Sequence, residues 1–356
     1  MSMTIEQWEP PFPYFGGKSQ VASVVWDALG DVPCFVEPFF GSGAVLFLRP
    51  HSAKIETVND ADSFVSNFWR AVQSAPEKVA DYADWIVSEP DLHSRHLWLV
   101  NKRESLTDRL CGDPDYFDAK IAGWWVWGLC AWIGSGFCSG NGPWITVDGR
   151  MVKSEDHEGI EAGKGVRRKR PNLGNNGQGV NRQRPHLGES DLGECALRRQ
   201  WLRRYLTRFA DRLRNVRVCC GDWARVCTPC VTTKHGLTGL FIDPPYADTA
   251  GRESNLYTVD SLQVAHDAKK FAVAHGDDPS YRIVFAGYDG EHEFPPSWRV
   301  HRWKTKGGMA NTSVDKNSNS NKNRHRECLF ISPHCLSDSK TPLFDVPEEV
   351  VNDTIS

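Results

Sequence analysis

The fold is decided by the stretch Leu240-Phe-Ile-Asp-Pro-Pro-Tyr246. Its three apolar residues predict the end of a buried parallel strand, and Pro244 and Pro245 stop that strand because neither can donate to a ladder. A carboxylate and an aromatic ring therefore follow the strand's carboxyl end, the edge where open α/β sheets bind ligands. Asp243 and the Pro244 carbonyl form an acceptor-rich corner for a planar amino group, with Tyr246 placed to stack on its ring. For this stretch alone, a strand ending in an ordinary turn is the alternative.

A strand, a glycine turn and an apolar helix are predicted over residues 34–46. Glu37 falls at the carboxyl end of the strand, and Gly41 and Gly43 let the backbone approach a ligand closely. The turn is neither the G-x-G-x-x-G dinucleotide fingerprint nor a P-loop with its lysine, which argues against NAD and ATP. The pattern predicts the first βα unit of a Rossmann-like sheet.

Two further predicted strands also end in acids. The strand over residues 54–60 ends in Asp60, whose carboxylate suits a ribose diol. The strand over residues 216–220 is followed by Asp222 and Trp223, an acid and a ring suited to an adenine. Taken alone, Asp60 is better explained as an exposed turn residue, whereas its place as the third feature in a series at the right spacing favours the ligand role.

A glycine pair followed by Lys18 precedes all of these strands. The apolar spacing after it predicts a helix, and we expect Lys18 in the first turn of that helix. Free amide donors gather there and an anionic carboxylate can be held. A plain surface turn before a helix explains the segment equally well.

The composition fits a globular protein of one large domain or two ordinary ones, with 24% charged and 40% hydrophobic residues among 356. No apolar run reaches transmembrane length and the first residues show no signal pattern, so we expect a cytosolic protein. The eleven cysteines are scattered without framework spacing, which favours reduced thiols. Cys227 and Cys230 form the one C-x-x-C pair, and no metal is expected there.

The alternation of strands and helices stops between about residues 90 and 194. Its first part predicts helices, and the tryptophans of residues 121–132 are interpreted as packing residues. Residues 163–193 are rich in Gly, Asn and Arg, and Arg170-Pro-Asn-Leu-Gly174 recurs as Arg184-Pro-His-Leu-Gly188. This basic loop predicts contacts to phosphates or base edges, while a solvated disordered loop remains open. Its basic residues are Lys164, Arg167, Arg168, Lys169, Arg170, Arg182 and Arg184.

The remaining chain returns to alternating helices and strands. Apolar spacing predicts helices over residues 197–213 and 263–275, a strand over 282–288, and a final hairpin of 300–305 with 328–332. Lys306 and Arg324 lie in the Asn- and Ser-rich loop of that hairpin, where they could reach a phosphate backbone. The tail from residue 337 to 356 is acidic.

Taken together, the glycine pair with Lys18, the Glu37-Pro-Phe-Phe-Gly-Ser-Gly43 box, Asp60 and the Asp243-Pro-Pro-Tyr246 box resemble the Dam-like (α-class) adenine-N6 DNA methyltransferases. The resemblance covers roughly residues 10–75 and 195–335. It implies a Rossmann-like methyltransferase fold, S-adenosylmethionine as methyl donor, DNA as partner, and a DNA-recognition insert. The implied domains are a donor-binding part (1–89), an inserted recognition region (90–194), a catalytic part (195–336) and the tail. Phage, prophage or orphan bacterial enzymes are the nearest type, with or without a companion nuclease.

The resemblance also implies roles for individual residues. The methionine part of the donor is assigned to Tyr14, Gly17 and Lys18, and the donor pocket to Glu37, Phe39, Gly41 and Gly43. Asp60 is assigned to the ribose and Asp222 with Trp223 to the adenine. Catalysis falls to Asp243, Pro244, Pro245 and Tyr246. Many relatives have Asp where this chain has Glu37, and the insert offers no match from which target readout can be carried over.

This set of residues predicts direct methyl transfer to the N6 of a flipped-out adenine, without a metal or a covalent cysteine. Asp243 and the Pro244 carbonyl would accept the two N6 hydrogens and aim the nitrogen lone pair at the methyl group. Cytosine N4 carries a similar amino group, although the aspartate that opens the box favours adenine in this resemblance. RNA as substrate and a non-catalytic nucleic-acid-binding protein on the same fold also remain open.

Overall fold

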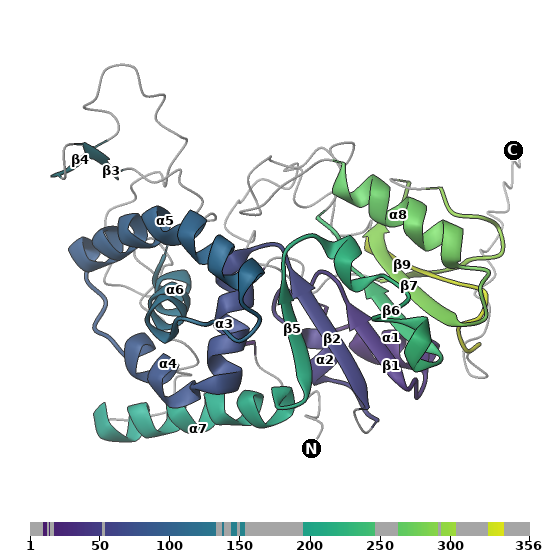
Figure 1. Ribbon diagram of the computed structural model, residues 1–356, viewed down its shortest axis with the longest axis horizontal. Helices are drawn as coiled ribbons and strands as arrows, with labels where there is room; N and C mark the ends of the chain where they lie inside the picture. The colour runs from purple at the N-terminus through teal and green to yellow at the C-terminus, as the bar shows by residue number, and fades with distance from the viewer. Residues whose placement is uncertain are drawn as a thin grey trace, which may run out of the picture.

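The computed structural model of the chain describes residues 10–12, 14, 18–51, 54–132, 137–138, 144–147, 150–153, 195–245, 263–290, 293–303 and 327–337. Of residues 144–147, 150–153 and 195–198, only the backbone is described. Figure 1 shows a twisted sheet flanked by helices, with a second body of helices beside one edge of the sheet. No helix within the described ranges combines the length and the apolar character needed to cross a membrane.

Seven strands form the main sheet. From one edge to the other they are β5 (Val216–Cys220), β2 (Ile55–Asp60), β1 (Cys34–Glu37), β6 (Thr238–Ile242), β7 (Tyr281–Tyr288), β9 (Glu327–Ile331) and β8 (Arg299–Arg302). The first five are parallel, whereas β9 runs antiparallel to both β7 and β8. The strand order reverses between β1 and β6, as at the switch point of a Rossmann sheet. The predicted Rossmann-like α/β fold is confirmed.

Both faces of the sheet are buried, as its parallel strands require. Phe35 of β1 and Phe241 of β6 face the helix α1 (Ala22–Leu29), where Trp26 packs on Phe35 with ring centroids 4.7 Å apart. Leu240 and Ile242, their neighbours along β6, pack instead with the helix α8 (Val264–His275) on the other face. All five residues of β6 are buried, so the apolar run that decided the fold is the central strand.

A body of helices connects β2 to β5 (Figure 1). It consists of α3 (Ser63–Ser74), α4 (Pro76–Ala83), α5 (Glu89–Gly112), α6 (Ala119–Ala131) and α7 (Cys195–Leu213). Trp125, Trp127 and Trp132 are buried, which confirms their interpretation as packing residues. The helix α4 was not anticipated from the sequence, and neither was the hairpin of β3 (Trp144–Val147) and β4 (Arg150–Lys153).

Side-chain caps fix where the helices of this body begin. Asp62 accepts a hydrogen bond from Phe64 N at 2.9 Å and Asp118 accepts one from Ile121 N at 2.9 Å, which satisfies amides that the first turns of α3 and α6 leave free. The two helices are joined at the same point, because the Asn67 side chain donates to Asp118 O at 2.9 Å and accepts from Asp118 N at 2.8 Å.

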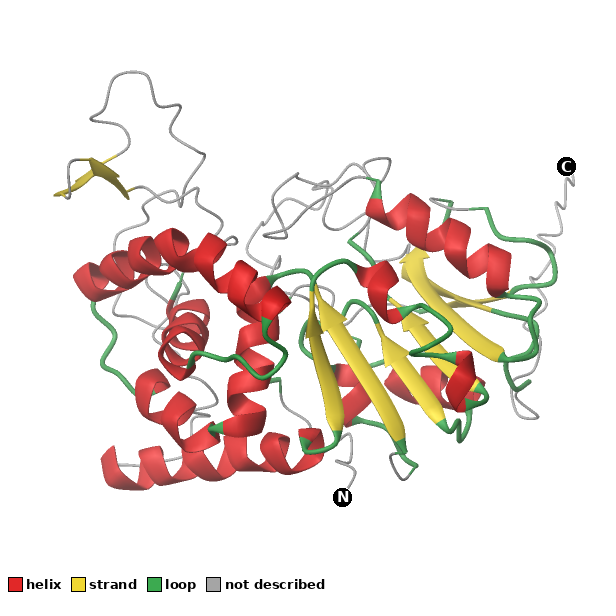
Figure 2. Cartoon of the chain, in the orientation of Figure 1, coloured by secondary structure: helices red, strands yellow, loops and turns green. Residues whose placement is uncertain are grey.

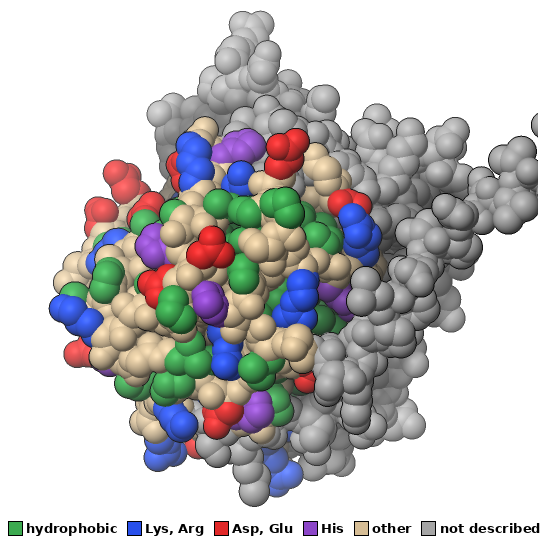
Figure 3. Space-filling view, turned by 90° about the vertical axis from the view of Figure 1, so that its right-hand side faces the viewer, with side chains coloured by type: hydrophobic (Ala, Val, Ile, Leu, Met, Phe, Trp, Pro, Cys, Tyr) green, Lys and Arg blue, Asp and Glu red, His purple; other side chains and the backbone are tan. Residues whose placement is uncertain are grey.

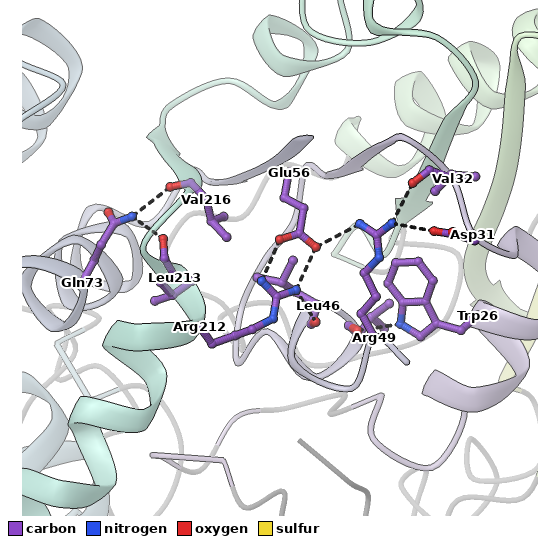
Figure 4. A network of polar contacts seen from close by, with 11 residues as sticks. Trp26, Asp31, Val32, Leu46, Arg49, Glu56, Gln73, Arg212, Leu213 and Val216 are labelled. Atoms are coloured by element: carbon purple, nitrogen blue, oxygen red, sulfur yellow. Dashed lines mark hydrogen bonds and ion pairs between the residues drawn. The ribbon is translucent and has the colours of Figure 1, made fainter. Parts of the chain in front are cut away.

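A buried ionic network fastens the returning chain to the sheet (Figure 4). Glu56 of β2 lies between two guanidinium groups: Arg212 of α7 contacts both carboxylate oxygens at 2.6 and 2.8 Å, and Arg49 contacts one at 3.0 Å. Arg49 also donates to Val32 O at 2.6 Å. Glu56 is the second residue of β2 and Asp60 the last, so this Glu56 clamp lies toward the amino end of the strand, away from its acidic carboxyl end.

The far edge of the sheet is completed by the predicted hairpin, β8 with β9. Figure 3 shows the face of the molecule at that end, where Lys and Arg side chains are interspersed with Asp, Glu and His. Positive charge is not concentrated on the described part of the face in Figure 3.

Two short 3-10 helices, η3 (Trp223–Val226) and η4 (Thr233–His235), lie between β5 and β6.

Candidate active site

Three acidic side chains meet at the carboxyl edge of the sheet, which the arrowheads of the parallel strands mark in Figure 2. Glu37 is the last residue of β1, Asp60 is the last of β2, and Asp243 directly follows β6. Because these strands are parallel neighbours, their ends bring the three carboxyl groups together, and the charges of Asp243 and Asp60 act on Glu37. The structure thus assembles the acids that the sequence analysis singled out.

Asp243 forms an ion pair with Lys18. The distance from Lys18 Nζ to Asp243 Oδ1 is 3.0 Å, and the side chains are 5% and 20% exposed. Burial raises the pKa of Asp243, and the nearby Lys18 ammonium lowers it again. The ammonium group therefore favours the ionised carboxylate in a place where burial alone would favour the acid.

Lys18 does not lie where the sequence predicted it within the chain. The helix α1 begins at Ala22, and Lys18 lies in the turn before it, where its carbonyl accepts from Val21 N at 3.1 Å. The expected position in the first helical turn is wrong, because a tight turn over residues 18–21 precedes the helix. This turn places the Lys18 side chain against the end of β6.

The glycine turn after β1 has the backbone that the pattern predicted. Gly41 and Gly43 have φ of +49° and +73°, a region that favours glycine. The ring of Tyr14 lies so close to Gly41 that a Cβ atom there would overlap it. At Gly43 a Cβ atom would lie 2.6 Å from the Phe40 ring. The turn is packed on its protein side, and it holds Tyr14 beside Gly41.

Asp60 accepts two backbone hydrogen bonds. Its Oδ2 accepts from Gly41 N at 2.9 Å, and its Oδ1 accepts from Asp62 N at 2.9 Å. Burial and the charge of Asp62 raise the pKa of Asp60 to about 7, although these two backbone bonds favour the ionised form. Each carboxylate oxygen has more than one acceptor site, so Asp60 retains capacity for the hydroxyl groups of a ligand.

An aromatic pair bridges the ends of β1 and β5. The Phe39 and Trp223 rings are stacked with centroids 6.0 Å apart and an interplanar angle of 29°, and both side chains are partly exposed. Asp222 is exposed, and one of its oxygens caps η3 by accepting from Ala224 N at 2.8 Å. The second oxygen and the ring faces suit a planar nitrogen base.

Several predicted residues lie outside the described part of the chain. These are Gly17 of the glycine pair, Tyr246 of the central box, and the residues assigned to DNA, namely Arg167, Arg168, Lys169, Arg170, Arg184, Lys306 and Arg324. Pro244 is buried and Pro245 half-buried, directly after Asp243.

The sequence analysis missed a link from the helical body to this edge. Arg103 of α5 lies 3.5 Å from Asp62 Oδ1, stacks over the Phe64 ring at 4.5 Å, and donates to Cys138 O at 2.6 Å. Asp62 in turn donates its backbone N–H to Asp60. The position of Asp62 just before a helix was a readable capping signal, whereas no local pattern indicates its pairing with Arg103.

A second missed feature is a cluster of aromatic and basic side chains on α5 and α6. Trp98 and Trp124 pack edge to face with centroids 5.1 Å apart, and the Lys120 ammonium lies over both rings at 4.8 and 4.4 Å. Both tryptophans are partly exposed.

The β3–β4 hairpin was also missed, although the sequence carried a signal for it. Asp148-Gly149 between two short segments that contain apolar residues is typical of a two-residue hairpin turn.

Fold and side chains together define a Rossmann-like protein with acidic residues gathered at the switch point of its sheet, where such sheets bind ligands. Residues 14–107 match the family model described as D12 class N6 adenine-specific DNA methyltransferase. This span is roughly a quarter of the 356 residues, and it includes Tyr14, the glycine turn and Asp60 but not Asp243. The Dam-like resemblance is confirmed by this match, which supports DNA adenine methylation as the activity. No curated protein matches the chain.

Proposed function

We propose that this protein transfers a methyl group from S-adenosylmethionine to the N6 amino group of adenine in DNA. One observation carries the proposal. Asp243, which opens the Asp-Pro-Pro-Tyr box, lies at the end of the central strand β6, beside Lys18 and at the same edge as Glu37 and Asp60. The family match covers the residues of this site from Tyr14 to Asp60 and leaves out Asp243.

The described residues fit the donor. The Gly41–Gly43 turn has the left-handed backbone that favours glycine, Asp60 retains acceptor capacity for a ribose, and the Phe39–Trp223 pair offers ring faces to an adenine. Glu37 has a buried oxygen without a hydrogen-bond partner among the described residues. We assign the methionine part to Tyr14, Gly17 and Lys18. When bound, S-adenosylmethionine supplies an electrophilic methyl group on its sulfonium.

The acceptor chemistry depends on Asp243. An adenine N6 lone pair is conjugated into the ring, and hydrogen bonds from N6 to the Asp243 carboxylate and the Pro244 carbonyl would turn it toward the methyl group. The ionised carboxylate is the stronger acceptor of such a bond, and Lys18 favours that form. Positioning of this kind supplies much of the rate in such transfers. The base must leave the duplex to reach this corner, where we assign Tyr246 to stack on it.

DNA contacts are proposed for the insert and for the basic loops. Residues 90–194 form the recognition region in this proposal, between a donor-binding part (1–89) and a catalytic part (195–336). Four basic residues in succession, Arg167 to Arg170, together with Arg184, Lys306 and Arg324, would neutralise backbone phosphates. The partly exposed Trp98–Trp124 pair with Lys120 adds an aromatic and basic surface on the same insert.

The test is methylation of DNA by the purified protein, with modified bases identified by sequencing and by nucleoside mass spectrometry. We expect N6-methyladenine with the wild-type chain and none with Asp243→Ala, which should still bind DNA. Asp267→Ala, which removes an exposed carboxylate on α8, is the matched control and should methylate normally. N4-methylcytosine as product, methylation of RNA in preference to DNA, or undiminished activity of Asp243→Ala would each contradict the proposal.

A further inference from the structure

Glu37 carries a buried carboxyl oxygen that no described residue satisfies. The side chain is 3% exposed, and its Oε2 has no hydrogen-bond partner among the described residues. An acceptor left unsatisfied in the interior costs about 1–3 kcal/mol, and more if it is charged. A proton on the carboxyl group, or a ligand that brings its own hydrogen-bond donor, would relieve this cost.

The charges around Glu37 are negative. Those that act on it belong to Asp243 at the end of β6 and to Glu56 and Asp60 on β2. Within the part of the chain that the structure describes, Lys18 pairs with Asp243 at 3.0 Å, while Arg49 and Arg212 hold Glu56. Glu37 therefore lies in a place that would attract a cation.

Burial, followed by the charge of Asp243, raises the pKa of Glu37 well above its usual range. A hydrogen bond with the backbone of Leu46 acts in the opposite direction and is outweighed. The protein without its donor therefore keeps a proton on Glu37 up to a higher pH than an exposed glutamate would. A cation placed against the carboxyl group would lower the pKa of Glu37 and favour its ionised form.

We propose that Glu37 binds the α-ammonium group of the methyl donor and releases its proton to the solvent as it does so. This inference rests on the proposed function. The donor carries two cationic groups, and only the ammonium has N–H bonds, whereas the sulfonium has none to offer an unsatisfied oxygen. In the exchange the Glu37 O–H bond breaks, its electron pair stays on the carboxylate, and the proton passes to the buffer.

Donor binding thereby becomes linked to pH. A group whose pKa falls on binding releases a proton between its bound and free pKa, so the affinity rises with pH across that range. S-adenosylhomocysteine retains the α-ammonium and should release the same proton. 5′-Methylthioadenosine retains the adenine and the ribose but has no amino-acid part, so it should leave the Glu37 proton in place. Protons from Asp60 at the ribose are common to both ligands and cancel in the comparison.

The experiment is isothermal titration calorimetry of the full chain at pH 7 in phosphate and in Tris, whose ionisation enthalpies differ. The dependence of the binding enthalpy on the buffer counts the protons released. We expect about one more proton with S-adenosylhomocysteine than with 5′-methylthioadenosine. In Glu37→Gln, which keeps the side-chain size, S-adenosylhomocysteine should still bind, without that proton and with an affinity that changes less between pH 6 and 8.

Equal proton release with the two ligands in the wild-type chain, or an extra proton that persists in Glu37→Gln, would overturn the inference. If the wild-type chain binds 5′-methylthioadenosine too weakly to measure, the variant and the pH series decide the question. If the folded wild-type chain binds neither S-adenosylmethionine nor S-adenosylhomocysteine, the proposed function fails. If it binds both and methylates DNA without the proton, only the role of Glu37 fails.

Discussion

Lys18 Nζ lies 3.0 Å from Asp243 Oδ1, which joins the turn before the first helix to the end of the central strand. Burial raises the pKa of Asp243 and the Lys18 ammonium lowers it. In Lys18→Met we therefore expect the acid limb of the pH–rate profile for methyl transfer to move to higher pH. Lys18→Arg keeps the charge and should keep the acid limb near that of the wild type. An unchanged acid limb in Lys18→Met would contradict the role of the pair.

Gly43→Ala should destabilise the protein by about 1–3 kcal/mol, because the new Cβ meets the Phe40 and Phe47 rings and the backbone has φ of +73°. The donor affinity should fall with it, since the turn lies at the donor edge. Gly112→Ala is the matched control: its Cβ meets nothing within 4 Å, so stability should be unchanged or higher by about 0.5–1 kcal/mol. Chemical denaturation of both variants measures the difference.

The Glu56 clamp predicts a large loss of stability. Glu56→Ala leaves the Arg49 and Arg212 guanidinium groups buried without their carboxylate, so we expect a cost of roughly 3–5 kcal/mol. Asp81→Ala breaks a surface pair in which Arg203 and Asp81 are 40% and 43% exposed, and should cost less than about 1 kcal/mol. Similar unfolding midpoints for the two variants would show that the clamp is not a main support of the fold.

Asp60 predicts a pH dependence of stability. Its pKa of about 7 in the folded protein exceeds the value of about 3.9 expected in the unfolded chain. The folded state therefore binds more protons between these values, so the contribution of Asp60 is complete below about pH 4 and is lost as the pH rises through about 7. Thermal unfolding of Asp60→Asn without donor should show a flatter decline over this range. Asp108→Asn, at an exposed position on α5, should keep the wild-type slope.

The basic loop is tested by the salt dependence of DNA binding. Replacing Arg167, Arg168, Lys169 and Arg170 by glutamine should weaken binding and reduce the slope of log affinity against log salt by about 0.9 for each phosphate contact removed. Arg214→Gln, at an exposed position after α7, is the control and should leave the slope unchanged. A four-residue variant with the wild-type slope would leave the loop without its proposed role.

Local patterns were sufficient for most of the fold. The apolar run before Asp243 predicted the buried β6, and the strand over residues 216–220 was predicted with the bounds that β5 has. Acids at strand ends predicted the ligand edge, because parallel strands end on the same side of a sheet. The final hairpin was also predicted, although the insertion of β9 between β7 and β8 follows from pairing and not from any local pattern.

Contacts between distant residues could not be read from the sequence. Lys18 was expected to meet a ligand carboxylate, and its pairing with Asp243 depends on the meeting of two segments that are far apart in the sequence. The same holds for Glu56 with Arg212 and for Asp62 with Arg103. The β3–β4 hairpin was missed for a different reason, since its turn signal was present in the sequence and was overlooked.

The order in which the sheet is completed affects how the protein is made. In β1, Cys34 pairs with Ile55 on one side but with Thr238 on the other. At about 5–20 residues per second, a ribosome that has just finished β1 needs roughly 10–40 s to supply its second neighbour. During that time the backbone groups along one side of β1 are open to other chains. Expression at low temperature with a chaperone present should therefore raise the soluble yield more than substitutions on the surface of the folded protein would.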